Sequence, residues 1–244
     1  AIVEMCAETG THLVQFSTSE IYGKSPAVYL PGEPFPFSED DSNLILGPIT
    51  KHRWIYASSK QLLERVIHAY AFEGALTYTI IRPFNYIGER IDYLPSEIEG
   101  TPRVFSNFMD ALLTGCPLQL VNGGSQRRCY TYIADATEAH VRLLDNVDSS
   151  ARNQIFNVGV PTNETTIRGL AEKMVSIYEK RYLDPHAPRC RIIEMSGEKF
   201  YGAGYEDSDR RIPDITKLTS TTGWRPKYDL PSMLERLMDH YVSR

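Results

Sequence analysis

The chain has 244 residues, of which 42% are hydrophobic and 23% charged, and its formal net charge is −5. Such a chain can bury a sizeable core, which is typical of a globular protein with one large or two small domains. No run approaches the roughly 18 consecutive apolar residues of a membrane-spanning helix, and the acidic balance argues against nucleic acid as a partner. The four cysteines and six histidines are scattered along the chain. We therefore expect neither a metal site nor a disulfide framework, and a cytoplasmic protein.

Apolar periodicity, together with glycines and prolines, predicts strands that alternate with helices. The expected elements of the first part are the end of a helix at 1–10, a strand at 13–17, a long loop at 24–51, a helix at 54–73 and a strand at 77–82. The later ones are helices at 104–114, 134–146, 167–181 and 231–241, strands at 118–121, 129–133, 155–158 and 192–194, and a turn at 122–124. In the helix at 54–73 we expect an apolar stripe to face the core, formed by Ile55, Leu62, Val66, Ala69 and Tyr70. This order of elements is typical of an α/β fold with a parallel sheet.

Tyr56 and Lys60 lie four residues apart in the helix predicted at 54–73. This spacing places both side chains on one face of the helix, about one turn apart, so the ammonium group can favour the ionised phenol. An ionised phenol can act as a general base. The spacing alone is a weak pattern, because an aromatic residue packed beside a solvated lysine also produces it.

Four motifs occur in the order and spacing of the extended short-chain dehydrogenase/reductases that act on nucleotide sugars. They are Thr18-Ser19-Glu20-x-Tyr22-Gly23, Tyr56-x-x-x-Lys60, Arg82-Pro83-Phe84-Asn85-x-x-Gly88 and Gly223-Trp224-x-Pro226. Within that superfamily the chain resembles the UDP-glucuronic acid decarboxylases, especially the decarboxylase domain of the bifunctional polymyxin-resistance enzyme, and the UDP-apiose/UDP-xylose synthases. The residues that carry this closer resemblance are Arg53–Tyr56, Asn122–Gly124, Gln126–Cys129 and the run Tyr201–Pro213.

The resemblance implies a Rossmann-like, doubly wound parallel sheet with a smaller α/β substrate-binding lobe. Members of the family carry an amino-terminal strand and a Gly-rich turn that hold the dinucleotide pyrophosphate, and nothing in residues 1–17 matches them. We therefore interpret the chain as a fragment that lacks this part. Residues 1–100 are expected to form the carboxyl-terminal part of the NAD-binding domain. Residues 101–244 are expected to form mainly the nucleotide-sugar lobe, with segments near 129–158 returning to the first domain.

For the redox step, the resemblance assigns the proton transfer to Tyr56. Assisted by Lys60 and aligned by Thr18, Tyr56 takes the proton from the hydroxyl group at sugar carbon 4 while hydride passes to NAD. The residues implied to hold NAD are Tyr56, Lys60, Pro83 and Phe84.

Three further residues are implied to be catalytic. Ser19 and Glu20 match the groups placed beside sugar carbon 5, and Arg211 matches the arginine that meets the sugar carboxylate. A guanidinium binds a carboxylate through two hydrogen bonds, which is a physical reason for an arginine there. Spacing alone leaves an alternative open, in which Arg211 forms a surface ion pair with Asp207 or Asp209.

The resemblance also points to the residues that bind the diphosphate and the uridine. They are Arg53, Asn85, Arg103, Gln119, Leu120, Val121, Gln126, Arg127, Arg128 and Tyr205. Because side chains alternate along a strand, we expect only one of Arg127 and Arg128 to face the ligand.

These assignments predict NAD-dependent oxidative decarboxylation of UDP-glucuronate to a UDP-4-keto-pentose, to UDP-xylose, or to both. The apiose/xylose synthases carry cysteines at the positions of Ser19 and Ser58, and the serines found here favour decarboxylation without ring contraction. The alternatives are a UDP-apiose/UDP-xylose synthase, a nucleotide-sugar 4-epimerase, or a cofactor-free interaction fragment. Related enzymes pair through the Tyr-Lys helix and a neighbouring helix, so a homodimer is expected.

Overall fold

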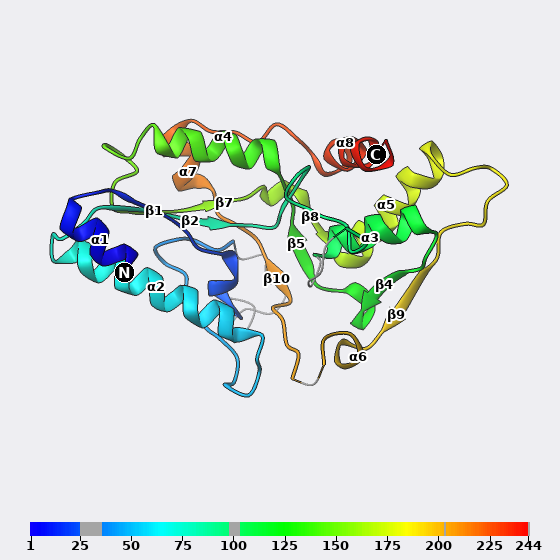
Figure 1. Cartoon of the computed structure of the whole chain (residues 1–244), viewed down its shortest axis with the longest axis horizontal. Coiled ribbons are helices and arrows are strands. Elements are labelled where there is room, and N and C mark those ends of the chain that lie inside the picture. Colours follow the sequence, from blue (N-terminus) through cyan, green and yellow to red (C-terminus); the bar gives the residue numbers. More distant parts are fainter. Residues whose placement is uncertain (25–35, 98–102, 203, 244) are drawn as a thin grey trace.

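Three parallel strands form the sheet that carries the motif-bearing segments of the first part of the chain. In the computed structural model, which describes residues 1–24, 36–97, 103–202 and 204–243, they lie in the order β1 (Leu13–Phe16), β2 (Tyr78–Pro83) and β7 (Gln154–Val158). Figure 1 shows α4 (Ile133–Leu144) over one face, and α1 (Ile2–Thr9) and α2 (Trp54–Phe72) over the other. The prediction of a parallel α/β sheet with helices on both faces is therefore confirmed.

Helix α2 packs on this sheet through a face that differs from the predicted one. Its buried residues are Trp54, Ala57, Glu64 and Ile67. Ile55 and Leu62 are instead 67% and 64% exposed, so the prediction that the stripe faces the core is wrong for them, whereas Tyr70 of the same stripe does pack against the core. The buried face includes a carboxylate that has a tertiary partner, because Glu64 forms an ion pair with Arg82 of β2 at 2.7 Å. A count of apolar residues along the chain does not detect such a partner.

The second part of the molecule is built from short strands covered by three longer helices. Strand β4 (Leu118–Val121) pairs with β9 (Ile192–Met195), and β5 (Arg127–Cys129) lies between β10 (Arg210–Arg211) and β8 (Glu164–Thr166). Helices α3 (Val104–Thr114), α5 (Ile167–Arg181) and α8 (Leu230–Val242) share one apolar core with β4. The remaining short elements are β3 (Tyr86–Ile87), β6 (Thr131–Tyr132), η1 (Ser19–Tyr22), η2 (Asn122–Gly124), η3 (Pro161–Asn163), α6 (Gly197–Tyr201) and α7 (Thr216–Thr222).

Most of the long elements begin and end where the sequence predicts them, and the errors fall in the short ones. The predicted strand at 129–133 is confirmed only in part: it contains β6 and the last residue of β5, which are separate strands that pair with different neighbours, and Ile133 already belongs to α4. Elements α6, α7, β3, β8 and β10 were not expected. Of the predicted loop at 24–51, residues 25–35 lie outside the described residues, and 36–51 contain no helix or strand beyond isolated bridges.

No described helix combines the length and the hydropathy needed to cross a lipid bilayer. Likewise, the described residues contain no group of three or more His, Cys, Asp or Glu side chains arranged to hold a metal ion.

The division of the chain near residue 100 into two domains stays a prediction.

Candidate functional site

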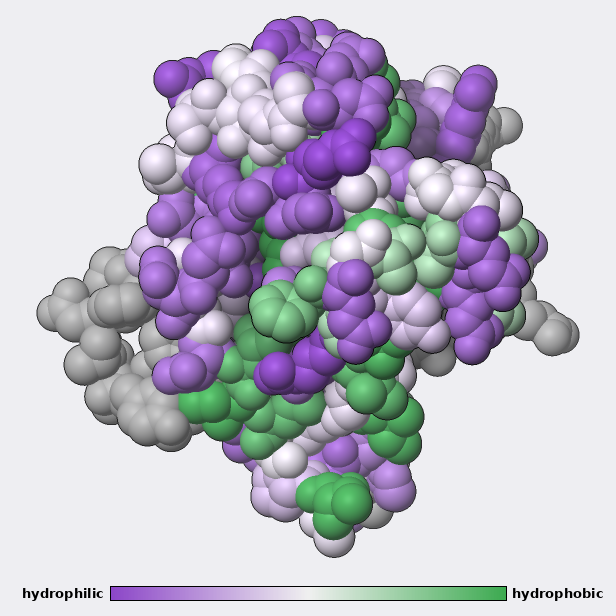
Figure 2. Space-filling view, turned by 90° about the vertical axis from the view of Figure 1, so that its left-hand side faces the viewer, coloured by the Kyte–Doolittle hydropathy of each residue, from purple (hydrophilic) through white to green (hydrophobic). Residues whose placement is uncertain are grey.

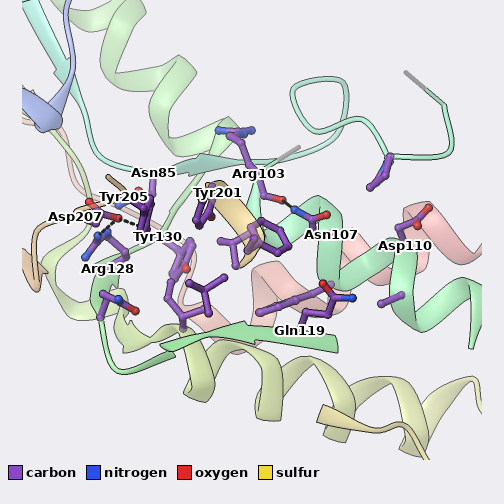
Figure 3. A pocket seen from close by; sticks show the side chains of 18 of the residues that line it. Asn85, Arg103, Asn107, Asp110, Gln119, Arg128, Tyr130, Tyr201, Tyr205 and Asp207 are labelled. Atoms are coloured by element: carbon purple, nitrogen blue, oxygen red, sulfur yellow. Dashed lines mark hydrogen bonds and ion pairs between the residues drawn. The ribbon is translucent and has the colours of Figure 1, made fainter. Parts of the chain in front are cut away.

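A cavity of about 420 Å³ lies where the two parts of the molecule meet (Figure 3). One end is charged and is lined by Glu20, Arg53, Arg128, Asp207 and Arg211. The other end is lined by both apolar and polar side chains of α3, and by Gln119 and Val121 of β4; the α3 residues are Val104, Asn107, Phe108, Asp110, Ala111 and Thr114. A cavity with converging charged groups at one end and mixed polar and apolar walls at the other suits a ligand that has a charged part and a less polar part.

The charged end is an arginine–carboxylate cluster, which we define as Glu20, Arg53, Arg128, Asp207 and Arg211. Arg53 donates to Glu20 through both of its Nη atoms, Nη1 to Oε2 and Nη2 to Oε1, the latter at 2.6 Å. Asp207 lies 2.8 Å from Arg128, 3.5 Å from Arg211 and 3.9 Å from Arg53. Arg211 also lies 3.6 Å from Glu20. Three guanidinium groups face two carboxylates, so the cluster itself has an excess of one positive charge and attracts an anion.

The cluster perturbs the pKa values of its members. Burial alone would raise the pKa of Asp207, but attraction by Arg211, Arg128 and Arg53 outweighs it and lowers that pKa to about 2. Burial and the neighbouring Arg128 lower the pKa of Arg211 to about 10. Arg211 is 4% exposed, and its Nε atom has no hydrogen-bond partner among the described residues. A buried donor without a partner is costly, so this atom favours an incoming acceptor.

Tyr56 and Lys60 lie together on the exposed side of α2, as their spacing predicts. The Lys60 Nζ atom donates to the Phe16 carbonyl at 2.9 Å and lies 5.9 Å from the centre of the Tyr56 ring. Tyr56 is 46% exposed. Thr18 caps η1, since its hydroxyl accepts from the Glu20 amide at 3.2 Å, and Ser19 beside it is buried. Thr18, Ser19, Tyr56 and Lys60 do not line the cavity, whereas Glu20 and Arg53 on the same two segments do.

The residues assigned to NAD differ in how accessible they are to a cofactor. Tyr56 and Lys60 have accessible polar atoms at the carboxyl end of β1, which is where parallel sheets bind dinucleotides. They therefore fit the cofactor. Pro83 ends β2 and is half-buried. Phe84 is fully buried, its amide donates to Val158, and its carbonyl accepts from Thr131, so its expected contact with NAD stays a prediction.

The residues assigned to the nucleotide fall into two groups. Those that line the cavity are Arg53, Asn85, Arg103, Gln119, Val121, Gln126, Arg128 and Tyr205. Leu120 points instead into the apolar core, as the alternation along β4 requires. Arg127 pairs with Glu164 at 3.2 Å outside the cavity. Of the two adjacent arginines only Arg128 faces the cavity, which agrees with the expected alternation.

Two polar side chains that line the cavity, those of Arg103 and Asn85, are fixed by hydrogen bonds within the protein. Arg103 donates to the Tyr86 carbonyl at 2.5 Å and to the buried Asp92 carboxylate at 2.6 Å. Asn85, with a φ of 41°, donates to the Cys129 carbonyl at 3.1 Å. Both side chains therefore connect the loops around the cavity.

Sequence reasoning missed several residues of this site. Asp207 was considered only as a surface partner of Arg211, but both side chains are buried and Asp207 contacts three arginines. Tyr130 lines the cavity, and its buried hydroxyl has no partner among the described residues. Tyr201 stacks on Tyr205 with ring centres 4.2 Å apart, and Figure 3 shows both rings on the cavity side. The run Tyr201–Pro213 was the only signal available, and it does not reveal burial.

Comparisons with known proteins agree with this architecture. The model of a family described as "NAD dependent epimerase/dehydratase family" matches residues 1–159. The chain is 44% identical to UDP-D-apiose/UDP-D-xylose synthase of Oryza sativa subsp. japonica, over 98% of this chain and 62% of the relative. It is 42% identical to UDP-D-apiose/UDP-D-xylose synthase 2 of Arabidopsis thaliana, over 98% of this chain and 64% of the relative.

Among solved structures, the PbgP3 protein from Burkholderia pseudomallei is similar with a TM-score of 0.81 and 34% identity. The similarity covers 100% of this chain and 67% of that chain. The chain thus spans less than two thirds of the length of the two plant relatives, since it covers 62% and 64% of them. From the family match and these identities, the chain belongs to the NAD dependent epimerase/dehydratase family.

Proposed function

We propose that the intact protein catalyses the NAD-dependent oxidative decarboxylation of UDP-glucuronate, yielding a UDP-4-keto-pentose or UDP-xylose. The observation that carries the proposal is the arginine–carboxylate cluster. It has one excess positive charge, and the Nε atom of Arg211 has no hydrogen-bond partner among the described residues. A sugar carboxylate supplies the charge and the acceptor that this end of the cavity lacks. The diphosphate and uracil then extend along the cavity toward Arg128 and β4.

Oxidation at sugar carbon 4 comes first in this proposal. The ionised Tyr56 oxygen accepts the proton of the carbon-4 hydroxyl and becomes neutral, and Lys60, on the same face of α2, stabilises the negative charge that this oxygen carries before the transfer. Thr18 aligns the sugar hydroxyl while its own hydroxyl caps η1. When bound, NAD supplies a hydride acceptor, and Tyr56 and Lys60 would hold its nicotinamide end.

Loss of carbon dioxide follows from the oxidation. The ketone at carbon 4 lies β to the carboxylate carried on carbon 5, so the electrons released from the carbon–carbon bond delocalise into the carbonyl. The protein has to orient the carboxylate and later return a proton to carbon 5. Arg211 holds the carboxylate, Glu20 lies 3.6 Å from Arg211, and the buried Ser19 precedes Glu20 on η1.

The nucleotide is bound by the residues that line the rest of the cavity. We assign the diphosphate to Arg128, Asn85, Gln126 and Tyr205, and the uracil to Gln119 and Val121. Arg53 is held by Glu20 in a two-bond ion pair, so it reaches the substrate only together with that carboxylate. In this proposal the sheet β1-β2-β7 is part of the NAD-binding domain, and the second part of the chain is mainly the nucleotide-sugar lobe.

A second candidate function is that of a UDP-apiose/UDP-xylose synthase. It is favoured by the names of the two plant relatives at 44% and 42% identity. Ser19 and Ser58 favour decarboxylation without ring contraction, because the apiose/xylose synthases carry cysteines at these two positions. Both reactions release carbon dioxide, so the nuclear magnetic resonance spectrum of the product pentose separates them: an unbranched ring supports decarboxylation alone, and a branched, contracted ring supports the synthase.

The test uses the intact parent protein with UDP-glucuronate and NAD, and follows carbon dioxide, NADH absorbance and the mass of the nucleotide sugar. Carbon dioxide with stoichiometric NADH indicates release of the 4-keto-pentose, and carbon dioxide without NADH indicates internal reduction to UDP-pentose. Absence of carbon dioxide from a cofactor-loaded protein would refute the proposal and favour a 4-epimerase. Tyr56→Phe is expected to lower kcat by about 10²- to 10⁴-fold. Tyr93→Phe is its control, since Tyr93 is comparably exposed, 50% against 46%.

We also propose that the protein forms a homodimer through α1 and α2. Ile55 and Leu62 on α2, and Ile2 and Met5 on α1, are each more than half exposed. Figure 2, which faces this side of the molecule, shows hydrophobic side chains gathered on its lower half. A surface of this kind on adjacent helices suits pairing with a second copy around a two-fold axis.

The dimer is tested by light scattering of the intact protein. Leu62→Asp is expected to shift the molar mass from two copies to one, because it buries a charge in the interface. Phe72→Asp, at the end of the same helix and 85% exposed, is the control and should leave the molar mass unchanged. A wild-type protein with the mass of a single chain would contradict the homodimer.

A further inference from the structure

Arg82, near the end of β2, uses almost all of its hydrogen-bonding capacity inside the protein. It is 3% exposed and does not line the cavity. Its Nε and Nη2 atoms donate to the two oxygens of Glu64 at 3.2 and 2.7 Å. Nη1 donates to the Tyr22 hydroxyl at 2.8 Å and to the Glu39 carbonyl at 3.2 Å. The guanidinium carbon also lies 5.0 Å from the centre of the Tyr22 ring. Arg82 therefore has four fixed attachments on three segments.

Two of the attached segments, α2 and η1, carry proposed catalytic residues. Glu64 is on α2, one helical turn after Lys60 and two after Tyr56. Tyr22 ends η1, the short helix that contains Ser19 and Glu20 and is capped by Thr18. Arg82 itself is followed directly by the Pro83-Phe84-Asn85 segment at the end of β2. One buried cation thus joins three separate parts of the site.

The network continues toward Arg211. The Tyr22 hydroxyl donates to Asn157 at 2.8 Å, and the Asn157 side chain donates to the Phe37 carbonyl at 2.7 Å and to the Asp214 carbonyl at 3.3 Å. Phe37 in turn forms a bridge with Pro213, two residues after Arg211. The position of the arginine–carboxylate cluster is therefore linked to the same buried network.

Stability alone is a weak reason for such an arrangement. Desolvation of both charges offsets most of the attraction in a buried ion pair, and well-packed apolar residues of similar volume often serve equally well. A buried polar network does fix orientation, because each donor must keep its acceptor in a narrow range of distance and angle. The directional constraint is thus the property that apolar packing at this position would lack.

Helix geometry gives the scale of the effect. Tyr56 is eight residues from Glu64, or about 12 Å along the axis at 1.5 Å per residue. A tilt of about 5° around Glu64 would therefore move Tyr56 by about 1 Å. A displacement of about 1 Å between reacting groups is enough to lower a rate by about 100-fold.

We propose that Arg82 is a positioning residue for the reaction: held between Glu64 and Tyr22, it fixes α2 relative to η1, and so fixes Tyr56 relative to Thr18, Ser19 and Glu20. This inference rests on the proposed function in that it takes Tyr56 as the proton acceptor. The cavity walls on α3 and β4, which include the residues assigned to the uracil, are not attached to Arg82, so we expect loss of Arg82 to change nucleotide binding much less than kcat.

The first test measures the intact parent protein with Arg82→Lys and with Tyr22→Phe. Lysine keeps the charge but cannot bind both Glu64 oxygens and Tyr22 at once, and phenylalanine removes only the hydroxyl from a ring stacked on Phe37. We expect kcat to fall at least tenfold in Arg82→Lys and less in Tyr22→Phe, while the Kd for UDP stays within twofold. The control is Arg142→Lys, the same change in an arginine that binds Glu138 and the Thr222 carbonyl away from the network, and it should leave kcat unchanged.

A second measurement does not depend on any substrate. Hydrogen exchange in residues 53–60 and 17–22 should be at least threefold faster in Arg82→Lys than in wild type, with residues 104–121 unchanged. This result supports the inference even if the wild-type protein releases no carbon dioxide from UDP-glucuronate, so the two proposals fail separately. An unchanged exchange pattern, unchanged kcat, or a loss of UDP affinity equal to the loss of kcat would overturn the positioning role.

Discussion

Replacing Asp207 with asparagine tests the electrostatics of the arginine–carboxylate cluster. The change keeps the shape of the side chain but removes one of two negative charges beside three arginines. Asp207 has a side chain that is 15% exposed and a pKa of about 2, against the ordinary 3.8. The folded state therefore favours the ionised carboxylate, and the variant loses that contribution.

The magnitude follows from the difference between the two pKa values. A difference of almost two units corresponds to about 2 kcal/mol of the free energy of unfolding. Because the pKa is lower in the folded state, the stabilisation is complete above the unfolded-state value of 3.8 and is lost as the pH falls toward 2. About half of it remains at pH 3. At pH 7 a loss of about 2 kcal/mol corresponds to a decrease in Tm of about 4 to 8 °C for a chain of this length.

The assay is urea denaturation of wild type and Asp207→Asn at pH 7, 5 and 3. We expect the difference in unfolding free energy to be constant between pH 7 and 5 and to decrease by pH 3. Asp148→Asn is the control, since Asp148 pairs with Arg152 at the surface with 88% of its side chain exposed, and it should change stability by less than about 0.5 kcal/mol. A difference that is absent at pH 7, or as large at pH 3 as at pH 7, would refute the reasoning.

Two other predictions concern the cavity and the buried network. Arg128→Lys should weaken UDP binding by about tenfold or more, because lysine lacks the planar donors that contact Asp207 and the cavity. Arg127→Lys, outside the cavity, should leave UDP binding unchanged. Calorimetry with UDP measures both variants, and equal effects would contradict the assignment. Burial raises the pKa of Glu39 to about 7 from 4.5, so the folded state loses stability as the pH rises from about 4.5 through 7. Glu39→Gln should therefore be more stable than wild type by about 3 kcal/mol at pH 8 and equally stable near pH 4, and urea denaturation showing no gain at pH 8 would contradict this.

The sequence predicts the regular elements of this protein well where local signals are strong. Helices α3 and α5 and strand β4 have the predicted bounds, because apolar periodicity and flanking glycines or prolines are encoded within each segment. The strand predicted at 129–133 has the wrong bounds, because Cys129 belongs to β5 and residues 131–132 form β6, which pairs elsewhere, and pairing between distant segments leaves no local signal. The order and spacing of the motifs also suffice to recognise the family.

Burial and partner choice are what the sequence does not encode locally. The stripe with Ile55 and Leu62 has the period of a core face, yet α2 packs through the face that contains Glu64, because Arg82 on a distant strand neutralises that carboxylate. Asp207 reads as a surface acid in the sequence, but the fold brings it against three arginines from three separate segments. The sequence by itself thus determined the elements, the family and the Tyr56–Lys60 pair, which depend on neighbours along the chain. Only the tertiary structure decided which charges meet, because ion pairs and burial depend on residues that are distant in sequence and close in space.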